Sequence, residues 1–229
     1  MTTDLLWTLE EIRAFERHLQ DDLRLPALLL MENAAAGTAR MVTQLAQDQG
    51  FTTILLICGG GHNGGDAATA ARHLVGTGLH LILATPFGPP KPGSLTEAAL
   101  RTCASLGLTA ASQPGLPALI ASADLVVDGL FGTGLDRPLA GHALQTIRDL
   151  DSAGRPILAL DLPSGLDATT GAVHGAALHA RWTLTFAGRK AGLARGAGPA
   201  HAGEVRVAPI GVSEGVARAW LTRRRAATG

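Results

Sequence analysis

The residues best suited to chemistry lie in residues 53–66, TILLICGGGHNGGD, where an apolar run breaks into a glycine-rich turn holding Asn63 and Asp66. The run has the length and β-branched content of a buried parallel strand, and the alanine-rich residues after Asp66 favour a helix. We expect the glycines at 59, 60, 61, 64 and 65 to give the turn unusual backbone angles. A strand, a glycine turn and a helix N-terminus leave N–H groups and the positive end of the helix dipole facing outward. The segment therefore predicts an anion site for a nucleotide-like ligand.

The same glycines also fit the turn of a dinucleotide-binding dehydrogenase. Gly59, Gly61 and Gly64 satisfy G-x-G-x-x-G, a spacing that is a weak signal alone. That motif requires an acidic residue about 20 residues later to hold a ribose hydroxyl. The next predicted strand, residues 79–84, instead runs into Thr85 and Pro86. A hydride-transferring enzyme and a purely structural turn remain alternatives, while the sequence favours a different nucleotide-shaped ligand.

Two further apolar runs end in an aspartate that precedes a glycine-containing loop. Asp128 lies in LVVDGLFGTGLDRPLAG and Asp161 in ILALDLPSGLD. Ligands of open α/β sheets bind at the carboxyl ends of the strands, so these loops and the glycine turn would converge if their strands are neighbours. Either aspartate alone could equally cap a turn or a helix. Three such loops in one chain favour a shared site.

The elements that must position these residues alternate between helix and strand. Thr8 and Glu11 form a capping-box pattern ahead of an amphipathic helix, and a second helix is predicted from Pro26 toward Gln47. Strands are predicted at residues 53–58, 79–84, 124–127, 156–160, 182–186 and 204–208. Alternating strands and helices predict an α/β fold, a three-layer αβα sandwich with a Rossmann-like, mostly parallel sheet. No long helix separates the last two predicted strands, so antiparallel pairing at this edge of the sheet stays an alternative.

Length and composition set the limits of the prediction. The 229 residues predict one domain over 1–229, with a core of about 8–212 and a C-terminal tail at 213–229 whose arginines 223–225 are solvated. Equal numbers of basic and acidic residues, 19 each, speak against nucleic acid and membrane surfaces as partners. Neither a leader nor a long apolar stretch is visible, so we expect a cytoplasmic protein with Cys58 and Cys103 reduced. The histidine spacing does not predict a zinc site.

Taken together, five segments resemble the YjeF N-terminal domain family, the NAD(P)H-hydrate epimerases. They are LMENAAAG at 30–37, CGGGHNGGD at 58–66, VDGLFGTGLDRPLAG at 127–141, LDLPSGLD at 160–167 and TFAGRKAGL at 185–193. They follow the family's order over nearly the whole chain. The resemblance implies an isomerase that repairs NADH or NADPH hydrated at C6 of the nicotinamide ring by interconverting the R and S forms.

The resemblance also implies the roles of individual residues. The substrate would be held by His62, Asn63, Gly64, Gly65 and Asp66, by Gly132, Thr133, Gly134, Leu135, Asp136, Arg137 and Pro138, and by the catalytic Asp161. One potassium ion per subunit would be bound by Asn63, Asp128 and Ser164. An amide oxygen, a carboxylate and a hydroxyl are hard ligands that suit such a cation and do not suit zinc. Turn capping by Asn63 and Ser164 is the alternative interpretation.

The residues also suggest a mechanism. The ring nitrogen can assist departure of the C6 hydroxyl as water, which leaves a planar cation that water can re-enter from either face. We hypothesise that Asp161 shuttles the proton and stabilises the developing charge. Position 62 carries histidine where the family commonly has asparagine, and a role for His62 and a neutral surface variant both stay open. Lys190 is interpreted as a solvated loop charge, with orientation of the substrate as the alternative.

Family resemblance further implies a homodimer and a separate NAD(P)H-hydrate dehydratase partner, because the sequence ends at Gly229 without a second domain. The competing hypothesis is a non-catalytic nucleotide-binding module of the same fold, such as the ligand-binding or RNA-associated scaffolds found in larger proteins. The neutral charge balance argues against the RNA-associated version.

Overall fold

A computed structural model describes residues 5–111 and 115–228 and contains a seven-stranded sheet in the order β3-β2-β1-β4-β5-β6-β7. Every neighbouring pair of these strands is parallel, including β6 with β7, so the edge that the sequence left open is not antiparallel. The strands are β1 (Thr53–Cys58), β2 (His80–Ala84), β3 (Ala110–Ala111), β4 (Leu125–Gly129), β5 (Ile157–Leu160), β6 (Trp182–Phe186) and β7 (Glu204–Ala208). The predicted α/β class and Rossmann-like sheet are confirmed; the two-residue strand β3 was not predicted.

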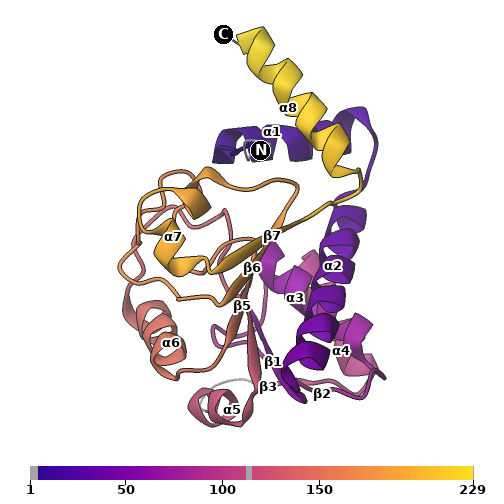
Figure 1. Cartoon of the computed structure of the whole chain (residues 1–229). Helices are drawn as coiled ribbons and strands as arrows, with labels where there is room; N and C mark the ends of the chain where they lie inside the picture. Colours follow the sequence, from indigo (N-terminus) through magenta and orange to yellow (C-terminus); the bar gives the residue numbers. More distant parts are fainter. Residues whose placement is uncertain (1–4, 112–114, 229) are drawn as a thin grey trace.

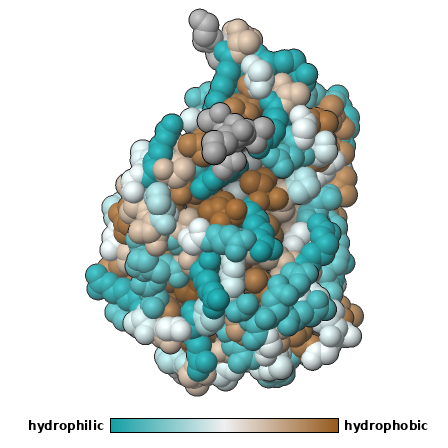
Figure 2. Space-filling model, in the orientation of Figure 1, coloured by the Kyte–Doolittle hydropathy of each residue, from teal (hydrophilic) through white to brown (hydrophobic). Residues whose placement is uncertain are grey.

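Helices cover both faces of the sheet, as Figure 1 shows: α2 (Ala27–Gln49), α3 (His62–Leu74) and α4 (Leu95–Ser105) lie on one side, and α5 (Leu116–Ser122) and α6 (Gly141–Ser152) on the other. The chain also forms α1 (Leu9–Arg17), the π-helical turn η1 (His18–Asp22), the 3-10 turn η2 (Ala191–Ala194), α7 (Gly198–His201) and α8 (Glu214–Thr228). Hydrophilic and hydrophobic residues are interspersed on the face seen in Figure 2. Among the described residues, none of the helices is both long and apolar enough to cross a bilayer.

The central strands are apolar throughout because both of their faces are buried. Ile54, Leu56 and Cys58 point into the core beneath α2 and α3, whereas Leu55 and Ile57 point into the core beneath α5 and α6. Successive side chains of a strand face opposite sides of the sheet, so each side receives its own set. This accounts for the uninterrupted hydrophobic run that precedes the glycine turn.

Strands β1, β4 and β5 are neighbours, which brings the three predicted loops to one edge. Ile57 of β1 pairs with Asp128 of β4, and Asp128 pairs with Ala159 of β5. Since the strands are parallel, the segments that follow them all leave at the carboxyl end of the sheet. The strand order reverses between β1 and β4, the position where ligands of such sheets bind.

Helices α1 and α8 pack together beyond β6 and β7 (Figure 1). The predicted capping box is present, because Thr8 accepts a hydrogen bond from the Glu11 N–H and Glu11 accepts one from the Thr8 N–H. The segment expected to be a solvated tail is helical, and its Trp220 ring stacks on that of Trp7 with centroids 6.1 Å apart. Two of its three consecutive arginines form ion pairs with α1.

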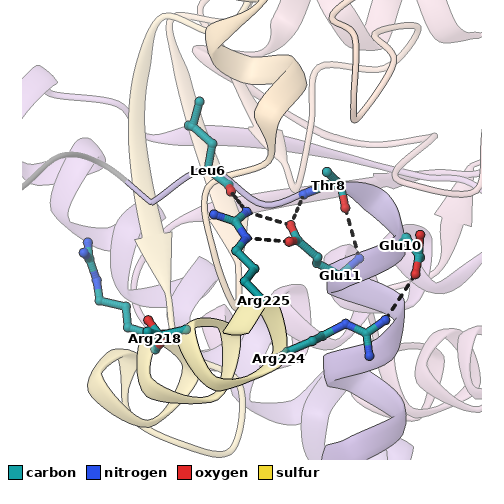
Figure 3. Close-up of polar contacts among 8 residues, drawn as sticks. Leu6, Thr8, Glu10, Glu11, Arg218, Arg224 and Arg225 are labelled. Carbon is teal, nitrogen blue, oxygen red and sulfur yellow. Dashed lines mark hydrogen bonds and ion pairs between the residues drawn. The ribbon is translucent and has the colours of Figure 1, made fainter. Parts of the chain in front are cut away.

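Arg225 provides the main polar link between the two helices (Figure 3). Its guanidinium donates to both carboxylate oxygens of Glu11, at 2.7 and 2.9 Å, and to the carbonyl of Leu6 at 2.7 Å. Arg224 donates to Glu10 at 3.1 Å. Partial burial disfavours the charge of Glu11, but the hydrogen bonds from Arg225 and Thr8 outweigh this effect, so the pKa of Glu11 is lowered.

We therefore predict that Arg225→Gln lowers the free energy of unfolding at pH 7 by about 1 kcal/mol, the scale of a half-exposed ion pair with good geometry. A lowered carboxyl pKa contributes stability above the unfolded-state value of about 4.3 and loses it as the pH falls through the folded value. In urea titrations, the difference in free energy of unfolding between the variant and the unsubstituted protein should therefore decrease toward acid pH. Arg223→Gln, on the same helix, is the control; an equal loss in both variants would contradict the role of the Arg225 pair.

Candidate functional site

A cavity of about 1260 Å³ opens at the carboxyl end of β1, β4 and β5. It is lined by most of the residues predicted to bind substrate, namely His62, Asn63, Asp66, Gly132, Thr133, Gly134, Leu135, Asp136, Arg137, Pro138 and Asp161. Gly64 and Gly65 lie in the wall behind it, and Asp128 and Ser164 are fully buried below it. The structure thus brings the predicted residues to one place, and only some of them face the cavity.

None of the five glycines of the turn has the unusual backbone angle that was predicted; Gly59, Gly64 and Gly65 are instead required for close packing, whereas Gly60 and Gly61 have open space around them. Positions 59, 60, 61, 64 and 65 are absent from the glycines with positive φ. A Cβ atom on Gly64 would lie 1.9 Å from the carbonyl oxygen of Gly59, and one on Gly59 would lie 2.0 Å from that of Leu130. The first turn of α3 therefore packs directly against the end of β1 and the β4 loop.

Helix α3 begins earlier than expected, at His62, so the polar residues of the turn belong to its first turn. Its N-cap, Gly61, provides no side-chain hydrogen bond, which leaves the first N–H groups of a 13-residue helix without a side-chain cap. The Asn63 side chain is buried, and neither atom of its amide has a hydrogen-bond partner within the described ranges. A buried amide without partners is rare in folded proteins, so both atoms of this amide are available to bind a ligand.

Asp128 and Ser164 form a buried network beneath the cavity. The Ser164 hydroxyl donates to Asp128 Oδ1 at 2.6 Å, its N–H donates to Oδ2 at 2.8 Å, and the Leu130 N–H donates to Oδ1 at 3.1 Å. Burial raises the pKa of Asp128 to about 6, although these hydrogen bonds oppose the shift. The Ser164 hydroxyl also lies 3.2 Å from the carbonyl oxygen of Phe131, next to Gly132.

Gly132 connects this network to the other two loops. A Cβ atom at Gly132 would lie 3.4 Å from Cγ of Asn63 and 3.5 Å from Oδ2 of Asp161. The amide of Asn63 and the carboxylate of Asp161 therefore flank the same short stretch of backbone. Asn63, Asp128, Asp161 and Ser164 meet around one crevice, at the edge where the three predicted loops converge.

Asp161 adopts a left-handed conformation that is uncommon for a non-glycine residue. Its φ is +67°, and the Leu162 N–H donates across it to the carbonyl of Leu160 at 2.8 Å, forming a γ-turn. The neighbouring strand ends similarly, since Ala187 has φ +65° and the Gly188 N–H donates to Phe186 at 2.7 Å. Such strained residues persist where the surroundings determine them, and they cluster at functional sites.

Lys190 determines the surroundings of Asp161, and its interpretation as a solvated loop charge was wrong. The residue is only 1% exposed; its ammonium group contacts Asp161 Oδ1 and donates to the Phe186 carbonyl at 2.6 Å. The Phe186 N–H donates to the same carboxylate oxygen at 3.3 Å. A carboxylate and an ammonium so deeply buried stabilise one another only as a pair.

The N-terminal segment pairs with the backbone on either side of Lys190. Trp7 forms a parallel bridge with Lys190: its N–H donates to Arg189 at 2.9 Å, and its carbonyl accepts from Ala191 at 2.7 Å. The Trp7 ring is buried, and its nearest atom would lie 2.2 Å from a Cβ atom on Gly188. Glycine at 188 is therefore needed for the indole to pack against this loop.

Asp66 adds a second buried carboxyl group to the floor of the cavity. Burial raises its pKa well above the usual range, and the charges of Asp161 and Glu16 add to the shift while Lys190 opposes it. Its carboxylate makes no hydrogen bond to any residue that the structure describes. Asp66 is therefore suited to donate a hydrogen bond as a neutral acid.

The sequence analysis missed three cavity residues on α1 and η1: Arg13, Glu16 and Gln20. They recur at positions i, i+3 and i+7, so they share one face of the helix. Ile12, Phe15 and Leu19 fill the opposite, buried face. The polar stripe was visible in the sequence, but nothing indicated that it faces a cavity and not solvent.

Comparisons with known proteins agree with this geometry. Residues 27–192 match the family described as "YjeF-related protein N-terminus". The chain belongs to this family. Its fold also resembles the crystal structure of yeast ynu0, with a TM-score of 0.76 over 83% of each chain and 18% sequence identity.

Curated relatives match almost the whole chain. The NAD(P)H-hydrate epimerase of Limosilactobacillus fermentum is 34% identical over 90% of this chain and 97% of its own length. That of Rhodopirellula baltica is 32% identical over 90% of this chain and 84% of its own length. The "Bifunctional NAD(P)H-hydrate repair enzyme Nnr" of Moorella thermoacetica is 32% identical over 97% of this chain but only 43% of its own.

The burial of the Asp161–Lys190 pair leads to a prediction about stability. Lys190→Met should lower the free energy of unfolding by about 3–5 kcal/mol, because it leaves a buried carboxylate without a counter-charge. Adding Asp161→Asn should restore part of this loss, so that the two changes are not additive in a double-mutant cycle measured by urea unfolding. Additive effects, or a stable Lys190→Met single variant, would contradict the coupling. Lys91→Met, at the only other lysine, is the control.

Proposed function

We propose that this protein is an NAD(P)H-hydrate epimerase, an isomerase that interconverts the R and S forms of NADH or NADPH hydrated at C6 of the nicotinamide ring. The observation that carries the proposal is Asp161: a strained carboxylate, paired with Lys190, in the floor of a cavity lined by the open N-terminus of α3. Near full-length similarity to curated epimerases supports the same activity.

The dinucleotide would lie along the carboxyl edge of the sheet. We infer that residues 62–66, through the first turn of α3, and residues 132–138 hold its phosphates and ribose, while the nicotinamide ring reaches Asp161. Helix N-termini and loops with accessible N–H groups favour phosphate, and Arg137 adds a positive charge beside them. Gly64 and Gly65 would act through the shape of the turn, because neither lines the cavity.

The chemistry asked of Asp161 is proton transfer next to a developing cation. The C6–O bond breaks as the hydroxyl leaves as water, and the ring nitrogen lone pair yields a planar iminium cation. Water then adds to C6 and releases one proton, so the overall composition is unchanged. A carboxylate at this position exchanges the proton and stabilises the positive charge, and positioned acid-base groups contribute about 10²- to 10⁴-fold.

We further infer that the crevice beneath the cavity holds one K⁺ ion per subunit. The unpartnered Asn63 amide fits such an ion, since its oxygen is buried beside Gly132 with no protein donor. Asp128 and Ser164 would complete a set of hard oxygen ligands. The ion would supply positive charge that orients the β4 loop and the bound phosphates.

A dehydratase acting on one epimer, as a separate protein, is the partner we infer for this reaction. Support comes from the bifunctional repair enzyme, of which this chain matches 43% of the length. A homodimer remains part of the proposal, with light scattering of the purified chain as its test.

The proposed activity is tested by incubating a purified single epimer of hydrated NADPH with the protein and separating the products by chromatography. Asp161→Asn should lower the epimerisation rate about 10²- to 10⁴-fold while nucleotide binding is retained, because the amide cannot exchange the proton. Asp48→Asn, an exposed change on α2, should leave the rate unaltered. Tight nucleotide binding without interconversion by the unsubstituted protein would instead support the non-catalytic module.

Potassium binding is tested by thermal unfolding in KCl against NaCl at equal ionic strength. The melting temperature should rise with KCl, because an ion that binds only the folded state stabilises it. Asn63→Ala should abolish most of that rise, whereas Asn33→Ala, whose amide bonds only to Leu29 of its own helix, should not. An equal rise in both variants, or in both salts, would remove Asn63 from the site.

A further inference from the structure

Helix α1 crosses over the carboxyl edge of the sheet and forms the wall of the cavity opposite the strand ends. Just before the helix, Trp7 is bonded to residues 189 and 191, which follow β6. The Leu9 N–H donates to the Thr169 hydroxyl, after β5, at 3.2 Å, and Arg13 donates to the Thr133 carbonyl, after β4, at 3.3 Å. The helix is thus anchored successively above three loops of the site, with Asp161 in the floor beneath it.

The face of α1 turned toward the cavity carries a carboxyl group. Glu16 lies one turn after Arg13 and one turn before Gln20, all three lining the cavity. In the described part of the chain, the Glu16 carboxyl group makes no hydrogen bond, unlike those of Glu10 and Glu11, which pair with α8. Glu16 is therefore the carboxyl group of α1 left available to a ligand.

The electrostatic setting favours a proton on Glu16. Burial raises its pKa, and the charge of Asp161 adds to the shift, while Lys190, His62 and Arg13 oppose it. Because the charges of Asp161 and Lys190 both affect the pKa of Glu16, the three groups belong to one site. A carboxyl group with a raised pKa on one wall thus faces a carboxylate with a buried counter-charge on the other.

Epimerisation at C6 needs proton transfer on both faces of the nicotinamide ring, because water leaves from one face and returns to the other. A carboxylate fixed on one side of a planar ring reaches only the oxygen on that side. Asp161, held by Lys190 and by its γ-turn, cannot swing across the ring. Asp66 does not meet the need either, since it projects from α3 at the same strand edge as Asp161.

We propose that Glu16 is a second catalytic residue, placed on the face of the nicotinamide ring opposite Asp161. This inference rests on the proposed epimerase function. In one direction Glu16 gives its proton to the departing hydroxyl, the C6–O bond breaks and water leaves. Water then attacks the iminium carbon from the other face and passes a proton to Asp161. The proton has moved from Glu16 to Asp161, which readies the pair for the reverse reaction.

A single carboxyl group can still remove and return water on its own face, so oxygen exchange separates the two roles. Each purified epimer is incubated in H₂¹⁸O, and ¹⁸O at C6 and inversion are followed by chromatography and mass spectrometry against an enzyme-free blank. Glu16→Gln should epimerise about 100-fold more slowly or worse, while one epimer still incorporates ¹⁸O with retained configuration. Asp161→Asn should show the same exchange in the other epimer.

Matched variants keep the test decisive. Glu10→Gln makes the same change on the outer face of α1 and should epimerise normally. Glu16→Asp keeps a carboxyl group with a shorter reach and should recover part of the rate lost in Glu16→Gln, with both variants unfolding near the temperature of the unsubstituted protein.

Epimerisation by Glu16→Gln within about twofold of the unsubstituted rate, equal loss of ¹⁸O exchange from both epimers, or no recovery in Glu16→Asp would each overturn the assignment. If the unsubstituted protein neither epimerises nor exchanges oxygen, the proposed function itself fails. If the unsubstituted protein and the Glu16→Gln variant both epimerise the substrate and exchange its oxygen, only the role of Glu16 fails.

Discussion

The buried pair of Lys190 and Asp161 is the interaction on which the rest of the site depends. Two opposite charges with little exposure are tolerated only when each satisfies the other and nearby backbone groups complete the hydrogen bonds. The Phe186 backbone bonds to both members, and Trp7 bridges the backbone at Lys190. The pair therefore constrains the ends of β5 and β6, the N-terminal segment and, through it, the position of α1. It also explains why a carboxylate can be held in a strained γ-turn beside a cavity.

The sequence was sufficient to predict most of the fold because its signals are local. The apolar run at 53–58, the Thr8–Glu11 capping box and the alternation of strands and helices each identify an element from neighbouring residues. The order of the strands was not predicted, and it is the structure that places β1, β4 and β5 side by side. Strand β3, with two residues, is too short to leave a pattern. Helix α8 has arginines that resemble a solvated tail, and only its contacts with α1 distinguish the two.

The site was predicted wherever polar residues follow a strand, and missed where they come from elsewhere. Asn63, Asp128, Asp161 and Ser164 follow apolar runs, so convergence of the loops brings them together. Lys190 also follows a strand, yet its backbone bridges Trp7, which is 183 positions earlier in the chain, and its side chain is buried against Asp161. Glu16 lies on an amphipathic helix, and its sequence pattern predicts that the polar face is exposed to solvent. Long-range packing alone decides which charged residues are enclosed.

The bridge between Trp7 and Lys190 also bears on the order in which the molecule is built. Contacts between residues close in sequence form early, whereas those that close a very long loop are entropically costly until the intervening chain is compact. During synthesis, β1 to β5 can assemble before residue 190 leaves the ribosome, but the Trp7 bridge and the contacts of α1 with α8 cannot form until later. The wall of the cavity that α1 provides is therefore completed last, when nearly all of the chain has been made.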